Sequence, residues 1–417
     1  MLFIAGIIMR EVIQVNQKLP FAQGFPLSLQ HLFAMFGANI LVPILLGIDP
    51  AVVLLFNGVG TLLYMIITKK MIPAYLGASF AFIACGQLVI SQYGYADALG
   101  GFIAVGIVFC IVAVIIAKIG YQWVYAVLPP AAIGAVIAVI GLGLGPTAAK
   151  MAGLSAEAID PVTVSISMVT LGVTIAGYVF FKGFLSIIPI LIGIITGYLY
   201  AVLMGRVDFS IVAAAPWFSL PTFTTPVYNP AAIAIILPVV FVVIAEHIGD
   251  LIVIGSVVGN DMLKNPGLHR SFFGNGLSMI LSGCFGSTPN TTYSENVGVL
   301  AITRVFSVYV VAGAAALSVL LSFLGKFAAL IRTVPEAVIG GVSLLLFGVI
   351  ATSGIRTLME QKIDYSKPVN LVLTSVVLII GVSGARISVG GVVFEGMALA
   401  ALFAVVLGLI FKLFKKI

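Results

Sequence analysis

Apolar stretches separated by short polar breaks follow one another through almost the whole chain. Most of them approach the roughly 20 residues that a helix needs to cross the hydrocarbon core of a bilayer. The pattern predicts about fourteen membrane spans. The expected ranges are 27–46, 51–68, 74–91, 98–117, 123–145, 161–181 and 184–204, followed by 230–256, 270–285, 287–303, 306–325, 334–353, 368–385 and 392–411.

The composition supports a membrane protein and excludes a soluble one. Hydrophobic residues make up 61% of the chain and charged residues only 8%, whereas a soluble domain carries roughly 25% charged residues. We therefore expect an all-α polytopic membrane protein. Residues 23–417 should form one integral membrane domain, with repeats at about 27–204 and 230–411, after a cytoplasmic tail at residues 1–22.

The distribution of basic residues predicts the orientation. The net charge of +6 is spread over short loops with no basic patch, so nucleic-acid binding is not expected. With the predicted spans, most Lys and Arg residues fall on one side, which the positive-inside rule assigns to the cytoplasm together with both termini. The exceptions are Lys150, Arg206, Lys326, Arg332 and Arg386.

An internal repeat links the two halves of the chain. The segment PPAAIGAV at 129–136 recurs as PEAVIGGV at 335–342. Chance matching among residues common in membrane helices is the alternative explanation. In the predicted topology the two copies enter the membrane from opposite sides. The pattern thus favours two inverted repeats of seven spans each, an architecture that places substrate sites near the midplane between broken helices.

Two of the expected spans are poor helices. The range 73–90 begins PAYLGAS, and the range 287–303 begins STPNTTY. Proline, glycine, hydroxyl and β-branched residues favour extended backbone over helix. Non-helical backbone at membrane depth is tolerated where it is buried in protein or lines a cavity. We predict that these segments meet, with short extended pieces leading into half-helices.

Three carboxylates lie inside apolar stretches, where a charge is costly and usually marks a substrate or proton pathway. Glu246 and Asp250 are four residues apart, which places them on one helical face. Glu295 directly follows the second broken stretch. Each one alone could be a hydrogen-bonded structural group. Together they predict a transporter in which at least one of these carboxylates exchanges a proton.

The three histidines receive different interpretations. His247 adjoins Glu246 but points about 100° away around the helix, so we interpret it as a packing or interface residue. His269 is expected at the membrane interface. His31, at the start of the first span, is either a polar contact between helices or part of gating, and we count it among the proton-coupling candidates.

The chain resembles the nucleobase-ascorbate transporter family, also called the nucleobase:cation symporter family. The resemblance rests on AEHIGD at 245–250 and on STPNTTYSENVGVLAITR at 287–304. The family signature is met by Glu295, Asn296, Gly298, Thr303 and Arg304. PLSLQHLFAMFGANILVP, PAYLGASFAFI and GVSLLLFGVIATSGIR are also similar to the uracil-transporting branch of that family.

This resemblance implies a core domain and a gate domain, proton-driven uptake of uracil across the inner membrane, and pairing as a homodimer, without a metal or cofactor. It implies that Glu246 and Glu295 hold the uracil ring and that four further residues close the pocket. They are Ala38, Phe80, Tyr293 and Ser294. Glu246, Asp250, Glu295 and His31 are the implied or inferred proton-coupling residues.

Two positions depart from the uracil branch and leave alternatives open. Asp250 stands where that branch can have histidine and purine carriers often have aspartate, and Ser294 stands where it can have glycine. A xanthine or purine symporter is therefore the first alternative. An anion transporter on the same fold is the second. A membrane enzyme is the third, and no nucleophile and base pair supports it.

Overall fold

The computed structural model describes residues 12–155, 159–390 and 392–414, and this part of the chain is mostly helical. The helices are α1 (Phe21–Leu46), α2 (Pro50–Ile67), η1 (Phe80–Phe82), α3 (Ile83–Gln92), α4 (Tyr95–Ile119), α5 (Gln122–Val127), α6 (Pro130–Gly143), α7 (Gly145–Met151), α8 (Pro161–Phe180), η2 (Gly183–Ile187), α9 (Pro189–Leu203), α10 (Ser210–Ala214), α11 (Pro230–Ile236), α12 (Val239–Val258), η3 (Leu263–Gly267), α13 (Leu268–Cys284), α14 (Ser294–Thr303), α15 (Val308–Ser322), α16 (Gly325–Arg332), α17 (Glu336–Glu360), α18 (Pro368–Val382) and α19 (Gly396–Leu413). The strands are β1 (Leu76–Ala78), β2 (Asn290–Thr292), β3 (Arg386–Val389) and β4 (Val392–Glu395).

The length and surface of the helices suit a membrane. Within the described ranges, eight helical segments are long and apolar enough to span a bilayer, and four shorter helices are also apolar. On α4, Ile107, Ile111 and Val114 are exposed, and their spacing places them on one side of the helix. Apolar side chains directed outward suit a lipid environment. The structure thus supports a polytopic membrane protein, while the arrangement of about fourteen spans in inverted repeats stays a prediction.

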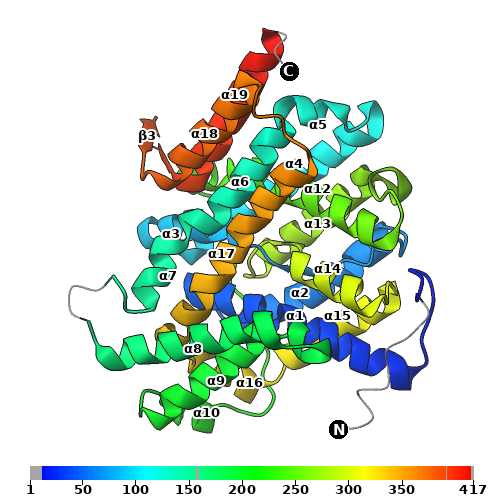
Figure 1. Ribbon diagram of the computed structural model, residues 1–417. Helices are drawn as coiled ribbons and strands as arrows, with labels where there is room; N and C mark the ends of the chain where they lie inside the picture. Colours follow the sequence, from blue (N-terminus) through cyan, green and yellow to red (C-terminus); the bar gives the residue numbers. More distant parts are fainter. Residues whose placement is uncertain (1–11, 156–158, 391, 415–417) are drawn as a thin grey trace.

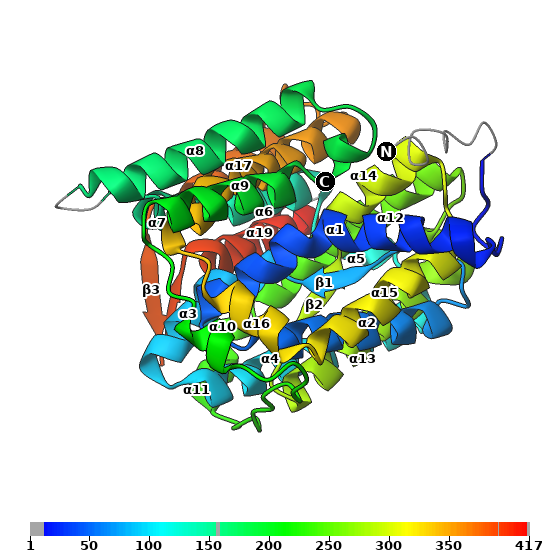
Figure 2. The same ribbon diagram turned by 90° about the horizontal axis from the view of Figure 1, so that it is seen from below.

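The helices pack in two groups, which Figures 1 and 2 show from two directions. In the first group, α2 and α4 both pack on α13, and α15 packs on α1 and α2. In the second group, α17 packs on α6, α8 and α9, and α18 packs on α6 and α19. Helix α12 contacts both groups, since it packs on α4 and α14 and also on α6 and α19. Side chains on α12 therefore lie where the two groups meet.

The two predicted broken spans meet as a pair of short strands, which confirms that prediction. β1 and β2 pair antiparallel, with Leu76 opposite Thr292 and Ala78 opposite Asn290. Each strand leads into a half-helix, β1 through η1 into α3 and β2 into α14. Figure 2 shows both strands in the middle of the bundle. Pairing satisfies backbone groups that lipid would leave without partners.

Side chains of neighbouring helices hold the strand pair. The hydroxyl of Thr61 on α2 accepts a hydrogen bond from the Leu76 N–H at 2.9 Å and donates to the Leu76 carbonyl at 3.3 Å. The Asn290 side chain accepts from the Ser278 hydroxyl at 2.8 Å and donates to the Phe56 carbonyl at 3.2 Å. All these contacts are buried. The strand crossing is therefore fixed to α2 and α13 of the first group.

The last predicted span begins later than expected. The range 392–411 was expected to span, but residues Val392–Glu395 form β4, which pairs with β3, and α19 begins at Gly396. Consecutive β-branched and aromatic residues favour a strand here. The Arg386 guanidinium binds the Glu395 carboxylate at 2.5 Å across the pair. The range 123–145 is also divided, because Pro129 and Pro130 separate α5 from α6.

An acidic side chain ties the turn between α1 and α2 to distant segments. Asp49 caps α2 by accepting from the Ala51 N–H at 3.0 Å, and it also accepts from the Thr222 N–H at 3.0 Å. The Arg332 guanidinium lies 3.0 Å from its carboxylate. Burial opposes the charge of Asp49, but the two N–H donors and Arg332 together hold the pKa of Asp49 below its ordinary value.

Replacement of Thr61 by valine tests the anchoring of β1. Thr61→Val keeps the side-chain shape and leaves the Leu76 N–H without its partner, so we expect a loss of about 1–3 kcal/mol in the free energy of unfolding. Thermal unfolding in detergent measures it. Thr174→Val is the matched control, since among the described residues that buried hydroxyl bonds only to the Thr170 carbonyl within its own helix α8. Equal destabilisation by both variants would contradict the anchoring role.

Replacement of Asp49 by asparagine should destabilise the protein by about 1–2 kcal/mol at pH 7. Because the folded-state pKa lies below the ordinary 3.8, the stabilisation is present at neutral pH and is lost as the pH falls below that value. Unfolding temperatures of both proteins should therefore converge on acidification. Glu336→Gln is the control, as this exposed glutamate has no hydrogen-bond or ion-pair partner among the described residues. A gap that stays constant down to low pH would refute the role of the charge.

Candidate functional site

Helix α12 carries two of the predicted carboxylates to the boundary between the helix groups. Glu246 and Asp250 lie one helical turn apart. Glu246 is half-buried, and Asp250 is 7% exposed. The negative charges of Asp250 and Glu295 both act on Glu246. The structure thus brings the three predicted carboxylates together.

Glu295 lies in the first turn of α14, directly after β2. The first backbone N–H groups of a helix have no partner within the helix, and the helix dipole makes this end partly positive. Because β1 and β2 are antiparallel and each is followed by a helix, both half-helices begin beside the strand crossing. The crossing therefore combines carboxylate acceptors with backbone N–H donors.

The other predicted pocket residues surround the same crossing. The Tyr293 hydroxyl donates to the Ala78 carbonyl at 2.6 Å, and its ring covers Gly77 so closely that no Cβ would fit there. Phe80 follows β1, and its ring centroid lies 6.1 Å from that of Phe347 on α17, edge to face. Ala38 is buried on α1, which packs against β1 and α14. The side chain of Ser294 lies outside the described part of the structure.

His31 is joined to the family signature on α14. The Asn296 side-chain nitrogen donates to His31 Nδ1 at 3.1 Å and lies 3.4 Å from the His31 carbonyl. Nδ1 is thus an acceptor, and a neutral His31 carries its proton on Nε2. The contact joins α1 to α14, as one of the two interpretations of His31 expected. Two other signature residues end α14, since the Thr303 hydroxyl donates to the Val299 carbonyl and Arg304 has a positive φ of 56°.

Several buried polar atoms near the crossing have no hydrogen-bond partner within the described residues. They are Glu246 Oε2, Ser79 Oγ, Thr291 Oγ1 and Asn296 Oδ1. Buried polar groups are normally paired, and leaving one without a partner costs free energy. Glu246 Oε2 is an acceptor that a ligand with N–H donors would satisfy. Among the described residues no group of His, Cys, Asp and Glu is arranged to hold a metal ion.

His247 has a more specific environment than the sequence indicated. It was interpreted as a packing or interface residue, but both ring nitrogens lie within hydrogen-bonding distance of hydroxyl groups. Nε2 lies 2.7 Å from Ser271 Oγ, and Nδ1 lies 3.3 Å from Thr292 Oγ1. Thr292 in turn donates to Asp250 at 2.7 Å. The sequence did not reveal this connection, because Ser271 and Thr292 are distant from His247 in the chain. The hydroxyl-rich run TTY at 291–293 was the one sign of polar partners near the site.

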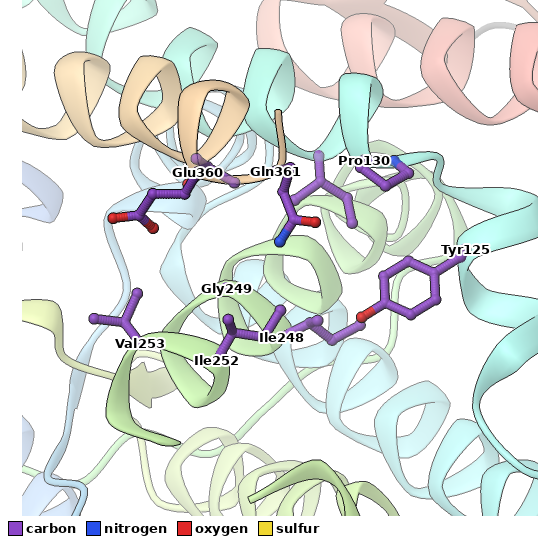
Figure 3. Close-up of a pocket in the computed structure, with 10 residues that line it drawn as sticks. Tyr125, Pro130, Ile248, Gly249, Ile252, Val253, Glu360 and Gln361 are labelled. Atoms are coloured by element: carbon purple, nitrogen blue, oxygen red, sulfur yellow. The ribbon is translucent and has the colours of Figure 1, made fainter. Parts of the chain in front are cut away.

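A cavity lies farther along α12, toward its C-terminal end, and its lining does not include Glu246, Asp250 or Glu295 (Figure 3). Ile248 and Ile252 of α12 form one wall. Tyr125 from α5 and Glu360 and Gln361 at the end of α17 lie opposite. The cavity thus separates α12 from the second helix group at one end of their contact.

Solved structures with a similar fold are transporters. The chain aligns with the transmembrane domain of a cyanobacterium bicarbonate transporter, BicA, at a TM-score of 0.65 and 14% identity, over 97% of this chain and 100% of that one. It aligns with the murine Solute Carrier 26 family member A9 anion transporter in the inward-facing state at 0.71 and 10% identity, over 96% of this chain and 69% of that one. These likenesses show the fold alone.

Sequence comparison shows closer relatives. Uracil permease of Paenibacillus larvae is 56% identical over 97% of this chain and 98% of its own length. Uracil permease of Escherichia coli is also 56% identical, over 97% and 95%, and that of Bacillus subtilis is 50% identical, over 92% and 91%. The profile of the Permease family matches residues 22–390. This chain is therefore a transporter rather than an enzyme, and it belongs to the Permease family, together with these uracil permeases.

Proposed function

We propose that the protein imports uracil across the bacterial inner membrane together with protons. The observation that carries this proposal is the buried Glu246 Oε2, which has no hydrogen-bond partner among the described residues and lies near Glu295, at a crossing where two half-helices begin. The high identity to uracil permeases supports the same substrate.

The chemistry of the crossing suits a uracil ring. Uracil presents two N–H donors and two carbonyl acceptors. Glu246 and Glu295 provide acceptors, and the N–H groups at the start of α14 provide donors. Phe80 would stack on the flat ring, since aromatic rings favour such contacts. Ala38, Tyr293 and Ser294 would enclose the remaining edges.

Proton coupling follows from the concentration of negative charge. Three carboxylates repel one another when all are ionised, so binding a proton relieves the repulsion. We propose that a proton on the cluster of Glu246, Asp250 and Glu295 favours uracil binding, and that loss of the proton favours release. His31 would contribute to coupling by fixing the position of α14, which carries Glu295, through its hydrogen bond with Asn296.

Transport requires that the two helix groups move against each other. We propose that the group holding β1, β2 and α12 is the core domain and that the group around α17 is the gate domain, in an inverted repeat of about fourteen spans. The cavity between α12 and α17 would be the cytoplasmic end of the path, because the positive-inside rule assigns Arg356 and Lys362 to that side. Both termini would then be cytoplasmic, in a homodimer surrounded by lipid.

A purine or xanthine symporter is the alternative that a specific residue favours. Asp250 occupies the position where purine carriers of the resembled family often have aspartate. Its carboxylate accepts from Thr292 at 2.7 Å, so it is fixed beside the strand crossing and near Glu246.

Uptake into proteoliposomes tests the function directly. Purified protein should accumulate labelled uracil when an inward proton gradient is imposed, and excess xanthine should not compete. Uptake blocked by xanthine would assign a purine carrier. Uracil uptake indifferent to the proton gradient would remove the coupling and leave the substrate.

Replacement of Glu246 by glutamine removes the charged acceptor and keeps the shape. Because a hydrogen bond to a charged group contributes about 2 kcal/mol, we expect the initial rate of uracil uptake to fall about 30-fold or more. Glu336→Gln is the matched control, since this exposed glutamate lies in the first turn of α17. Wild-type uptake by Glu246→Gln would exclude Glu246 from the site.

Replacement of Asp250 by asparagine tests the proton site. Asparagine can still accept from Thr292 but does not titrate in this range. We expect uracil exchange to persist while the pH dependence of gradient-driven uptake becomes flatter. Uptake measured across the acidic to neutral range compares the two proteins. An unchanged pH profile would place the coupling elsewhere in the carboxylate cluster.

A further inference from the structure

A continuous row of side-chain hydrogen bonds runs inward from Asp250. Thr292 of β2 donates to Asp250 Oδ2 at 2.7 Å, and its hydroxyl oxygen lies 3.3 Å from His247 Nδ1. His247 Nε2 lies 2.7 Å from the Ser271 hydroxyl, which lies 2.6 Å from the Tyr64 hydroxyl. We propose that this row, here called the Tyr64 to Asp250 chain, is a one-way series of donors that favours the ionised form of Asp250 and thereby sets the pH at which the transporter releases its proton.

The direction of the chain follows from the donor inventory. A threonine hydroxyl has one proton, and here that proton is donated to Asp250. Its oxygen must therefore accept from His247, which places the proton of a neutral His247 on Nδ1. Nε2 is then an acceptor and receives the Ser271 proton. The Ser271 oxygen in turn accepts from Tyr64, so each donor points toward the carboxylate.

Aromatic rings seal the middle of the chain. The His247 ring is surrounded edge to face by Phe272, Phe109 and Tyr64, with centroids 5.2, 6.3 and 6.3 Å away. His247, Ser271 and Thr292 are each no more than 1% exposed. Hydrogen bonds in such low-dielectric surroundings polarise one another. Each hydrogen bond from Tyr64 to Asp250 thus strengthens the next one, and burial of these side chains keeps water from competing for their donors.

The carboxylates near Asp250 do not belong to the Tyr64 to Asp250 chain. Glu246 on α12 and Glu295 on α14 are the carboxylates of the site, and Tyr64 on α2 also senses the charge of Asp250. Among the other elements packed on α12, α6, β2 and η1 contain no titratable side chain, and α19 has only Lys412 in its last turn. The titratable groups of α4 are also occupied or distant: Tyr95 bonds to Gly286, Asp97 to Asn229, Cys110 faces the Phe273 carbonyl, and Lys118 lies in the last turn. Those of α13 lie at the ends of the helix, with His269 and Arg270 in its first turn and Cys284 at its last residue.

Thr292, His247, Ser271 and Tyr64 are therefore positioning residues that act through Asp250. This assignment rests on the proposed proton coupling for its effect on transport. The direction of the donors can be measured without transport. The donor chain and the proposed proton coupling can therefore be refuted separately.

Nitrogen-15 NMR of histidine-labelled protein tests the chain. The sequence has only three histidines, and His247→Gln identifies the signals of His247 by their loss. We expect neutral His247 to carry its proton on Nδ1 in the wild type. In Thr292→Val the acceptor is removed, and the proton should move to Nε2. A wild-type His247 with its proton on Nε2 would overturn the proposal.

The pH profile of uracil uptake gives the functional readout. Loss of donors disfavours the ionised carboxylate, so we expect the midpoint to move to higher pH by about one unit or more in Thr292→Val. The shift should be smaller in Ser271→Ala and smallest in Tyr64→Phe, in the order of distance from Asp250.

Two controls separate this role from a structural one. Thr292→Ser restores the hydroxyl and should restore the wild-type midpoint. Ser318→Ala removes a buried hydroxyl that donates to the Leu54 carbonyl outside the chain, and should leave the midpoint unchanged. Equal midpoints in the wild type, Thr292→Val and Ser271→Ala would refute the proposal. If the wild type shows no proton dependence, the proposed coupling fails, and the NMR result still decides whether the chain exists.

Discussion

The pairing of β1 with β2 is the interaction on which the rest of the structure depends. Extended backbone inside a membrane protein exposes N–H and C=O groups that lipid cannot satisfy. Here each strand satisfies the other, and Thr61 and Asn290 bind the pair to α2 and α13. Because the strands are paired, two helices can begin in the interior, and the first N–H groups of each helix lie beside the crossing. The same pairing places Thr292 against Asp250.

Glu246 and Asp250 differ in the hydrogen-bond donors around their carboxylates. Glu246 has an oxygen without a donor among the described residues and lies where the two helix groups meet. Asp250, one turn away, is bonded to the rigid strand crossing through Thr292. In the proposed mechanism, substrate binding and proton binding would fall to neighbouring groups on one helix, and charge repulsion would couple them.

Much of this arrangement could be predicted from the sequence, for physical reasons. Glycine, proline and threonine in PAYLGAS and STPNTTY disfavour helix strongly enough to mark both broken spans. Carboxylates in apolar stretches are rare enough to select Glu246, Asp250 and Glu295 as candidates, and the structure brings them together. The environment of His247 could not be predicted, because helical geometry gives only its direction on α12. Its partners Ser271 and Thr292 come from separate segments that only the packing brings near. The β3–β4 pair was missed because its valines and phenylalanine also suit a membrane helix.

The two strands of the crossing come from opposite halves of the chain. When the first half has been synthesised, β1 has no partner, since residues Asn290–Thr292 have not yet been made. Its backbone must stay hydrated or be held by the insertion machinery until the second half arrives. Long-range pairing of this kind delays folding, because a large loop must close before the contacts form. The helices that precede β2 can thus enter the bilayer early, while the strand crossing is assembled only after residues Asn290–Thr292 have been made.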